Sequence, residues 1–248
     1  MKALVYTGPK QVEYLDFKDP SPTNGEFLVK ITNVGICGSD MHAYLGHDDR
    51  RPAPLILGHE ASGIIEEGEK KGESVVINPL VSCGECHYCL DGRSNLCPKR
   101  QIISMPPRQG AFAEYITMPP KNLIPIPEGL TTTKAALAEP LATAWHAVLT
   151  ASRHSHRPLS ETKGLVIGAG AVGLGSALSL KAFGCKEVSI AETNKLRRKT
   201  AEKAEIGIVV DPTHEGGIND DTMDVVIDAV GCKESRIAAV KSAKPGSV

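Results

Sequence analysis

Aromatic residues are scarce in this sequence, since Phe, Trp and Tyr together make up 4% of its 248 residues. A hydrophobic core must therefore be built from aliphatic side chains. An excess of charge is also lacking, because 28 Lys and Arg residues face 29 Asp and Glu residues, for a formal net charge of −1. A balanced chain has no long-range field to attract nucleic acid or acidic lipid, so neither partner is expected.

Long hydrophobic runs are missing as well. The longest stretch without a charged residue, residues 164–180, contains five glycines and is shorter than a membrane span. The N-terminus lacks the apolar segment of a signal peptide. With 41% hydrophobic and 23% charged residues, the chain has the composition of a globular protein. Its length allows one large domain or two ordinary ones.

Cysteine is present, but in an odd number. Seven cysteines argue against a disulfide framework and for a reducing compartment, so a cytoplasmic location is expected. Four of them follow the pattern C-x2-C-x2-C-x7-C. Four thiolates at this spacing can surround Zn²⁺ and leave no open coordination position, which predicts a structural zinc site. An iron–sulfur cluster would accept the same ligands, and the spacing does not exclude it. The four are Cys83, Cys86, Cys89 and Cys97.

The order of the predicted elements divides the chain in two. Residues 1–150 are rich in short strands separated by turn signals, and they end in an Ala- and Leu-rich helix that Pro140 interrupts. Residues 151–248 begin with a polar connection. From Gly164 onward strands and helices alternate, which predicts a parallel, doubly wound sheet and hence an α/β fold class.

A glycine-rich segment opens the second half, between an apolar strand and a predicted helix. It has the sequence Gly168-Ala169-Gly170-Ala171-Val172-Gly173, or G-x-G-x-x-G. This context is typical of a dinucleotide-binding turn. Gly168 permits the turn, Gly170 lets the backbone approach a pyrophosphate, and Gly173 lets the helix pack closely on the strand. The first helical amides, at Ala171 and Val172, receive the negative charge.

An acidic residue, Glu192, ends the next predicted strand, nineteen residues after Gly173. It would hydrogen-bond the ribose hydroxyls and repel a 2′-phosphate, which predicts NAD rather than NADP. Lys195, Arg197 and Arg198 lie close by in the sequence and weaken that preference. Arg197 is therefore also a candidate cofactor-binding residue.

Three further segments carry side chains that bind metals. Cys37 lies in Cys-Gly-Ser-Asp-Met-His, His59 and Glu60 lie in Gly-His-Glu, and Glu139 precedes Pro140. Together with the four-cysteine and glycine-rich segments, and in the same order along the chain, these motifs resemble the zinc-dependent medium-chain alcohol dehydrogenase family. The resemblance runs from Met1 to Val248 and is strongest to the sorbitol and polyol dehydrogenase branch.

The resemblance implies a GroES-like β-rich catalytic domain at residues 1–150, followed by a Rossmann NAD-binding domain at 151–248. It implies that Cys37 and His59 bind a catalytic Zn²⁺. Glu60 is the favoured third ligand. Glu139 either lies behind it or exchanges with it, and the choice between the two carboxylates stays open.

The function implied is hydride transfer between NAD and a secondary alcohol or polyol, or the corresponding ketone. One thiolate and one carboxylate leave zinc formally neutral, and an open position admits substrate. Ser39 would hydrogen-bond the substrate oxygen. His42 would pass the proton outward, since histidine titrates near neutrality.

The family resemblance also sets expectations for the whole chain. Four strands of the six-stranded dinucleotide fold are counted, so a truncated C-terminus is expected, as is a homo-oligomer, dimer or tetramer, at full length. An NADP-linked aldehyde or ketone reductase, a zinc-stapled non-enzymatic binding module and an inactive fragment of an enzyme are the alternatives.

Overall fold

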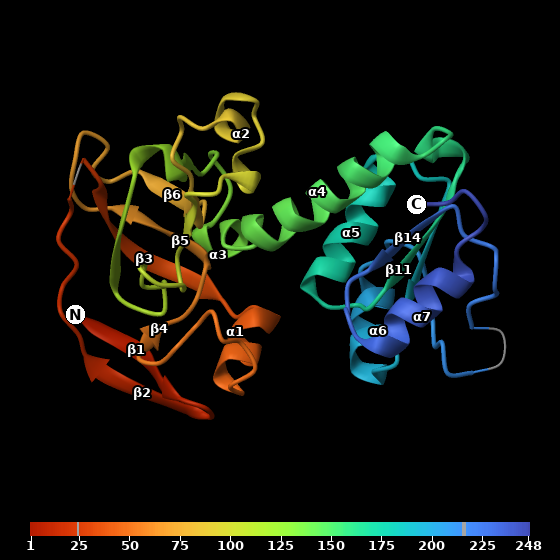
Figure 1. Ribbon diagram of the computed structural model, residues 1–248, viewed down its shortest axis with the longest axis horizontal. Coiled ribbons are helices and arrows are strands. Elements are labelled where there is room, and N and C mark those ends of the chain that lie inside the picture. The colour runs from red at the N-terminus through yellow and green to blue at the C-terminus, as the bar shows by residue number, and fades with distance from the viewer. Residues whose placement is uncertain (24, 215–216) are drawn as a thin grey trace. The chain divides into compact units, whose positions relative to one another are not determined.

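The structure of the chain is a computed structural model that describes residues 1–23, 25–214 and 217–248. The chain forms two compact units, Met1–Glu139 and Pro140–Val248 (Figure 1). This boundary lies earlier than the predicted one at residue 150. The reason is helix α4 (Ala138–His154), which buries Val148 in the core of the second unit. Most of this helix therefore belongs with the second unit rather than with the first.

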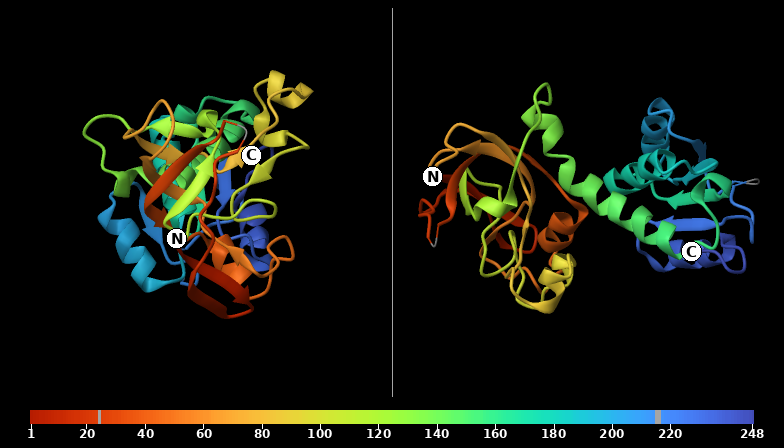
Figure 2. Two further views of the ribbon diagram at one scale, coloured as in Figure 1. Left: turned by 90° about the vertical axis from the view of Figure 1, so that its left-hand side faces the viewer. Right: turned by 90° about the horizontal axis from the view of Figure 1, so that it is seen from above.

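The first unit is built on antiparallel strands that curl around its core (Figure 2). Five strands pair in the order β10-β6-β5-β3-β9, three pair in the order β2-β1-β4, and β7 pairs with β8. Their bounds are β1 (Lys2–Gly8), β2 (Gln11–Asp16), β3 (Phe27–Gly35), β4 (Leu55–Ile56), β5 (Glu60–Ile65), β6 (Ser74–Ile77), β7 (Leu80–Val81), β8 (Gln101–Ile102), β9 (Tyr115–Met118) and β10 (Leu123–Pro125).

The core of this unit is aliphatic, as the scarcity of aromatic residues predicts. Val29, Ile65, Ile77 and Met118 are almost completely buried, and they lie on four different strands of the five-stranded sheet. Burial of each such side chain stabilises the fold by roughly 1.5–3 kcal/mol. Short helices join the strands: α1 (Gly38–Tyr44), α2 (His87–Leu90), η1 (Ser94–Leu96), η2 (Pro120–Asn122) and α3 (Thr132–Ala135).

The second unit contains the predicted parallel sheet. Its strands pair in the order β13-β12-β11-β14, and every pair is parallel. This is the alternating α/β arrangement expected from the sequence, and together with the curled antiparallel sheet it confirms the predicted fold class. The elements are η3 (Leu159–Glu161), β11 (Lys163–Ile167), α5 (Ala171–Ala182), β12 (Glu187–Ala191), α6 (Lys195–Lys203), β13 (Ile208–Val210), β14 (Val225–Asp228) and α7 (Lys233–Ser242).

One local feature differs from the sequence expectation. The predicted helix near Pro140 is broken before that residue, between α3 and α4, because Pro140 occupies the first turn of α4, where its missing amide has no intrahelical partner to lose. Among the described residues, no helix is both long enough and apolar enough to cross a bilayer.

Candidate metal centres and dinucleotide turn

Cys37, His59 and Glu60 form the first centre, because the sheet register brings their chain segments together. Strand β3 ends at Gly35, which pairs with Glu60 at the start of β5. Cys37 follows two residues after Gly35 and caps the N-terminus of α1. The candidate ligand atoms of Cys37, His59 and Glu60 all lie within 4.8 Å of one another. Sulfur, nitrogen and carboxylate oxygen are the donor set that zinc prefers.

The absence of a side chain at Gly35 leaves room for Glu60. A methyl group added at Gly35 would lie 2.3 Å from Glu60 Oε2 and 3.2 Å from Glu60 Cβ. Glu60 is 6% exposed. The glycine therefore permits the carboxylate to lie here, which makes it a site residue that the sequence analysis missed. A glycine directly opposite an acidic residue in a strand pair is a signal that requires the register to be known.

Asp40 is a second residue that the sequence analysis left without a role. It is 3% exposed, and its Oδ2 accepts a hydrogen bond from the Cys37 amide at 2.9 Å. Its Oδ1 accepts one from the Gly58 amide at 3.2 Å and lies 3.6 Å from His59 Nδ1. The last distance is too long for a hydrogen bond, so the contact with His59 is electrostatic. Asp40 thus ties the two ligand-bearing segments together, and its place three residues after a helix cap is a sequence signal for such a role.

The charges at this centre favour a cation. His59 and Ser39 lower the pKa of the Cys37 thiol, against the opposing effect of its burial. Burial opposes protonation of His59, but Asp40 and Cys37 outweigh it and raise the pKa of His59 to about 10. The Asp40 carboxylate and the Cys37 sulfur thus face the imidazole, and a divalent cation would compete with the proton for the same position. The donor set and the local charge therefore fit zinc.

The three predicted catalytic residues lie in different positions. Ser39 is half-buried on α1, with its hydroxyl close enough to Cys37 to lower the pKa of that thiol. His42 is on the same helix and is exposed. Glu139 is half-buried in the first turn of α4, outside the group of three clustered side chains that the described residues form.

The four-cysteine segment forms a second compact group of sulfur atoms. The Sγ atoms of Cys86 and Cys89 are 3.5 Å apart, as are those of Cys97 and Cys83, and Cys83 and Cys89 are 3.9 Å apart. A tetrahedron with Zn–S bonds of about 2.3 Å has edges of about 3.8 Å. The spacing matches a metal tetrahedron and is far too long for disulfides.

The acidity of these thiols also indicates a cation. The amides of Glu85 and Cys86 lower the pKa of Cys83 to about 6. At Cys86, the Cys89 amide favours the thiolate, but burial and the neighbouring sulfurs outweigh it and raise the pKa to about 11. Several thiolates this close repel one another, so all four can ionise together only around a positive ion. The cluster therefore fits zinc as well.

The glycine-rich segment forms a turn between β11 and α5. Gly168 has φ +98°, a conformation that side chains disfavour, and Gly170 caps α5. A methyl group at Gly173 would lie 1.9 Å from the Gly168 carbonyl oxygen, so this position requires glycine. Ala171 and Val172 begin α5, and their amides are among the N-terminal helix donors that have no partner within the helix.

Glu192 is buried beside this turn and connects it to the end of β12. Its Oε2 accepts a hydrogen bond from the Ala169 amide at 2.9 Å and its Oε1 accepts one from the Asn194 amide at 2.8 Å. Burial opposes ionisation, but these amides outweigh it and hold the pKa of Glu192 below its usual range. Each oxygen can accept another hydrogen bond. Arg197 is exposed on α6, and its charge further lowers that pKa.

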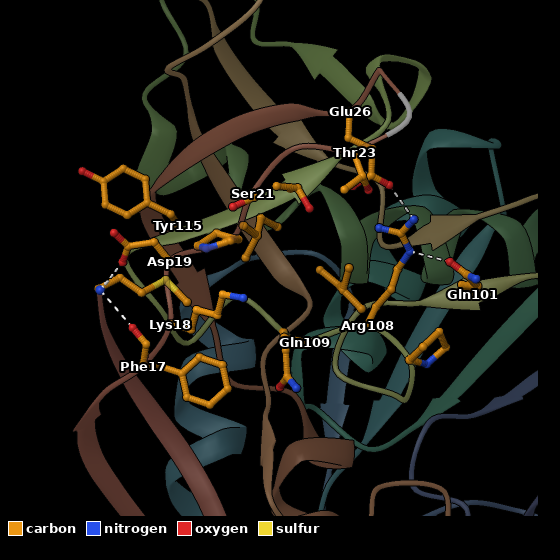
Figure 3. Close-up of a pocket in the computed structure, with 17 residues that line it drawn as sticks. Phe17, Lys18, Asp19, Ser21, Thr23, Glu26, Gln101, Arg108, Gln109 and Tyr115 are labelled. Carbon is orange, nitrogen blue, oxygen red and sulfur yellow. Dashed lines mark hydrogen bonds and ion pairs between the residues drawn. The ribbon is translucent and has the colours of Figure 1, made fainter.

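A cavity of about 570 Å³ lies elsewhere in the first unit (Figure 3). Its charged side chains include Arg108, which pairs with Glu26 at 2.6 Å, and Asp19, which pairs with the amino group of Met1. None of the seven predicted metal ligands lines it. The cavity is therefore separate from the two metal centres.

Comparison with known proteins agrees with these features. The sequence profile of the alcohol dehydrogenase GroES-like domain matches residues 23–128. The chain is 37% identical over 222 residues to L-galactonate-5-dehydrogenase of Escherichia coli K12, covering 87% of this chain and 63% of that one. It is 32% identical over 262 residues to sorbitol dehydrogenase of Bacillus subtilis 168, covering 99% of this chain and 73% of that one. The chain belongs to the zinc-dependent medium-chain alcohol dehydrogenase family.

A solved structure of this dehydrogenase family shares the fold. The alcohol dehydrogenase rspB of Escherichia coli CFT073, in complex with NADH, superposes with a TM-score of 0.85 at 31% identity, covering 100% of this chain and 74% of that one. Family membership, the four-cysteine cluster and the dinucleotide turn support zinc and a nicotinamide dinucleotide as cofactors. The chain spans 63% and 73% of the lengths of the two curated relatives.

Proposed function

We propose that the protein oxidises a secondary alcohol or polyol with NAD, and reduces the corresponding ketone in reverse. The observation that carries this proposal is the convergence of Cys37, His59 and Glu60 within 4.8 Å, in a chain whose second unit has a dinucleotide turn. Relatives named as sorbitol and L-galactonate-5-dehydrogenases support a substrate that carries several hydroxyl groups.

Cys37, His59 and Glu60 would hold the zinc ion. His59 turns Nδ1 toward Asp40, which leaves Nε2 for the metal. The thiolate and the carboxylate together balance the charge of Zn²⁺. When bound, zinc supplies a Lewis acid that polarises the substrate oxygen, and the nicotinamide supplies the hydride acceptor. Cys83, Cys86, Cys89 and Cys97 would hold a second zinc ion with a purely structural role.

Ser39 and His42 would move the proton that the alcohol loses. The Ser39 hydroxyl lies beside Cys37, where it can hydrogen-bond the substrate oxygen. His42 is exposed on the same helix, where its imidazole can pass a proton to water. Glu139 is proposed as a second carboxylate that alternates with Glu60 or orders water near it.

The second unit would hold the cofactor. The turn from Gly168 to Gly173 and the first amides of α5, at Ala171 and Val172, receive the pyrophosphate. Glu192 accepts hydrogen bonds from the ribose hydroxyls. It does so with the carboxylate lone pairs that the Ala169 and Asn194 amides do not use. Arg197 lies on the exposed side of this region and adds positive charge.

Turnover with NAD and a panel of sugar alcohols and secondary alcohols tests the proposal. We expect NAD reduction with at least one polyol and a loss of about 10²-fold or more in Cys37→Ser, because a metal ligand is removed. Cys232→Ser is the matched control, since Cys232 is exposed and outside both clusters. An inactive zinc-loaded protein, or a fully active Cys37→Ser variant, would contradict the proposal.

Two further expectations stay proposals. The family resemblance predicts a homo-oligomer, dimer or tetramer, at full length, which sedimentation of the full-length protein measures. The odd number of cysteines predicts a cytoplasmic location, which cell fractionation measures. A monomer, or a protein found in an oxidising compartment, would contradict them.

A further inference from the structure

Arg198 occupies an unusual position behind Glu192. Its side chain comes from α6, and its Nη1 donates hydrogen bonds to the carbonyl oxygens of Glu192 at 2.7 Å and Thr193 at 2.6 Å. Its Nη2 lies 2.7 Å from Asp211 Oδ2, and Asp211 directly follows β13. The guanidinium therefore joins the C-terminal ends of two neighbouring parallel strands, β12 and β13, at the point where Glu192 leaves β12.

Both members of this ion pair are largely shielded from water. The side chain of Arg198 is 18% exposed and that of Asp211 is 14% exposed. Asp211 Oδ1 accepts hydrogen bonds from the amide of Thr213 at 3.0 Å and from its hydroxyl at 2.6 Å, so this carboxylate is held by a second, independent contact. His214 Nε2 also lies 3.5 Å from Asp211 Oδ2. Asp211 is thus fixed, and its negative charge compensates that of Arg198.

The neighbouring arginine provides a contrast. Arg197 is exposed, whereas Arg198 already donates two hydrogen bonds to carbonyl oxygens of this chain and forms an ion pair with Asp211. A ribose 2′-phosphate carries roughly two negative charges and is recognised by guanidinium groups that are free to form paired hydrogen bonds. Arg198 is close to Glu192 in the chain but is not free in this sense.

We propose that the Arg198–Asp211 pair is a positioning device that makes the dinucleotide turn selective for NAD over NADP. It holds the 192–194 turn so that Glu192 faces the ribose, and it keeps the guanidinium from acting as a phosphate receptor. This inference rests on the proposed function, because it concerns the same cofactor site.

The test measures direct binding of NADH and of NADPH to the full chain. Binding is monitored by the change in nicotinamide fluorescence. Wild type is expected to bind NADH more tightly than NADPH. Asp211→Asn keeps the shape of the side chain but leaves the charge of Arg198 uncompensated. The ratio of the two dissociation constants should therefore shift toward NADPH by about tenfold, the effect of one unit charge near a phosphate. A purely structural role would instead weaken both cofactors equally.

Arg198→Gln removes the positively charged member of the pair. It should weaken NADH binding about tenfold by loosening the 192–194 turn, and it should not strengthen NADPH binding. The double variant Asp211→Asn/Arg198→Gln should not strengthen NADPH binding either. Glu187→Gln is the matched control, because it breaks the exposed Lys163–Glu187 pair at the opposite end of β12. Neither dissociation constant should change in this control.

The outcomes separate the two proposals. Unchanged selectivity in Asp211→Asn, or NADH binding by Arg198→Gln equal to wild type, would each overturn this inference while leaving the dehydrogenase proposal intact. A wild type that prefers NADPH would overturn this inference and the choice of NAD in the proposed function, but not hydride transfer itself. Failure of wild type to bind either dinucleotide would overturn both.

Discussion

A single carboxylate, Asp40, links two chain segments that are far apart in the sequence. It accepts hydrogen bonds from the amides of Cys37 and Gly58 and faces the ring of His59. The carboxylate is buried, so its hydrogen bonds and its charge act without competition from water. Asp40 therefore contributes to both the position and the electrostatics of the first centre, although it is not one of the three clustered candidate ligands.

Replacing Asp40 should weaken the first centre without unfolding the protein. Asp40→Asn keeps the shape of the side chain. It removes the negative charge that faces His59 and replaces one of the two acceptor oxygens of the carboxylate with an NH2 group. We expect zinc affinity at this centre to fall about 10–100-fold, as for other groups that orient a metal ligand. Competition with a chelator measures the affinity. Asp49→Asn, a change at an exposed neighbour, is the control, and equal affinities in the two variants would refute this role.

A buried ion pair between Arg51 and Asp48 holds the segment between α1 and β4. The guanidinium of Arg51 is 4% exposed, pairs with Asp48, and donates to the Ser104 carbonyl at 3.0 Å. Arg50, and then Arg51, lower the pKa of Asp48 from 3.8 to about 2. Because the folded-state pKa is depressed, the stabilisation is present above pH 3.8 and is lost as the pH falls toward 2.

Asp48→Asn should therefore destabilise the first unit at neutral pH. Leaving the buried Arg51 without its partner is expected to lower the free energy of unfolding by about 3 kcal/mol. Urea denaturation at pH 7 and at pH 3 measures the difference between variant and wild type, which should shrink at the lower pH. A difference that grows on acidification would contradict the assignment, and Asp49→Asn is again the control.

At the scale of elements, the four-cysteine segment has little to hold it together besides its sulfur atoms. It contains only the four-residue helix α2 and the three-residue helix η1, and of its residues Cys97 alone is buried. Because the segment has few apolar contacts, the free energy of its local unfolding is small unless a bound metal ion links its cysteines. This element thus depends on metal more than on a core.

Loss of one cysteine should open this segment and leave the rest folded. Cys97→Ser is expected to raise the rate of proteolytic cleavage within residues 83–97 by about tenfold or more. Mass spectrometry of the fragments locates the cut. Cys232→Ser should match wild type, and resistance of Cys97→Ser to protease would show that the segment needs no metal.

The dinucleotide turn is an element whose backbone contacts exclude a side chain. In Gly173→Ala the new methyl group would lie 1.9 Å from the Gly168 carbonyl oxygen, so the turn must move. We expect NADH affinity to fall more than about tenfold, since the amides no longer face the pyrophosphate together. In Gly8→Ala the methyl group meets only Gln11 Oε1 at 3.9 Å, and affinity should be unchanged. Equal binding by Gly173→Ala would refute the turn's role.

Sequence patterns predicted the elements better than their junctions. The strands and helices after Gly164 were predictable because hydrophobic runs alternate with charged helical segments. An interruption of the helix at Pro140 was predicted, but its place before Pro140 was not, because proline is compatible with the first turn of a helix as well as with its end. Gly35 was given no role, and Arg198 was predicted only to be a nearby charge that weakens the preference for NAD. Their structural contacts could not be predicted, since they depend on strand pairing and on a contact between α6 and the residue after β13.

At the scale of the whole molecule, each unit carries a different part of the proposed chemistry. The first unit contains both candidate zinc centres, and the second contains the dinucleotide turn. The spacing of the four cysteines predicted a zinc site by itself, because few residue types bind zinc. Cys37, His59 and Glu60 were predicted as ligands through the family resemblance. Which carboxylate approaches Cys37 and His59 was not readable, since it depends on the register of β3 against β5.

Zinc content per chain tests the central claim most directly. Elemental analysis of the purified protein should give two zinc ions for wild type, one for Cys37→Ser and one for Cys97→Ser, because each substitution removes a ligand from a different centre. The exposed Cys232→Ser control should retain two. If Cys37→Ser retained two zinc ions, Cys37, His59 and Glu60 would not form a metal centre, and the proposed chemistry would have no site in the first unit.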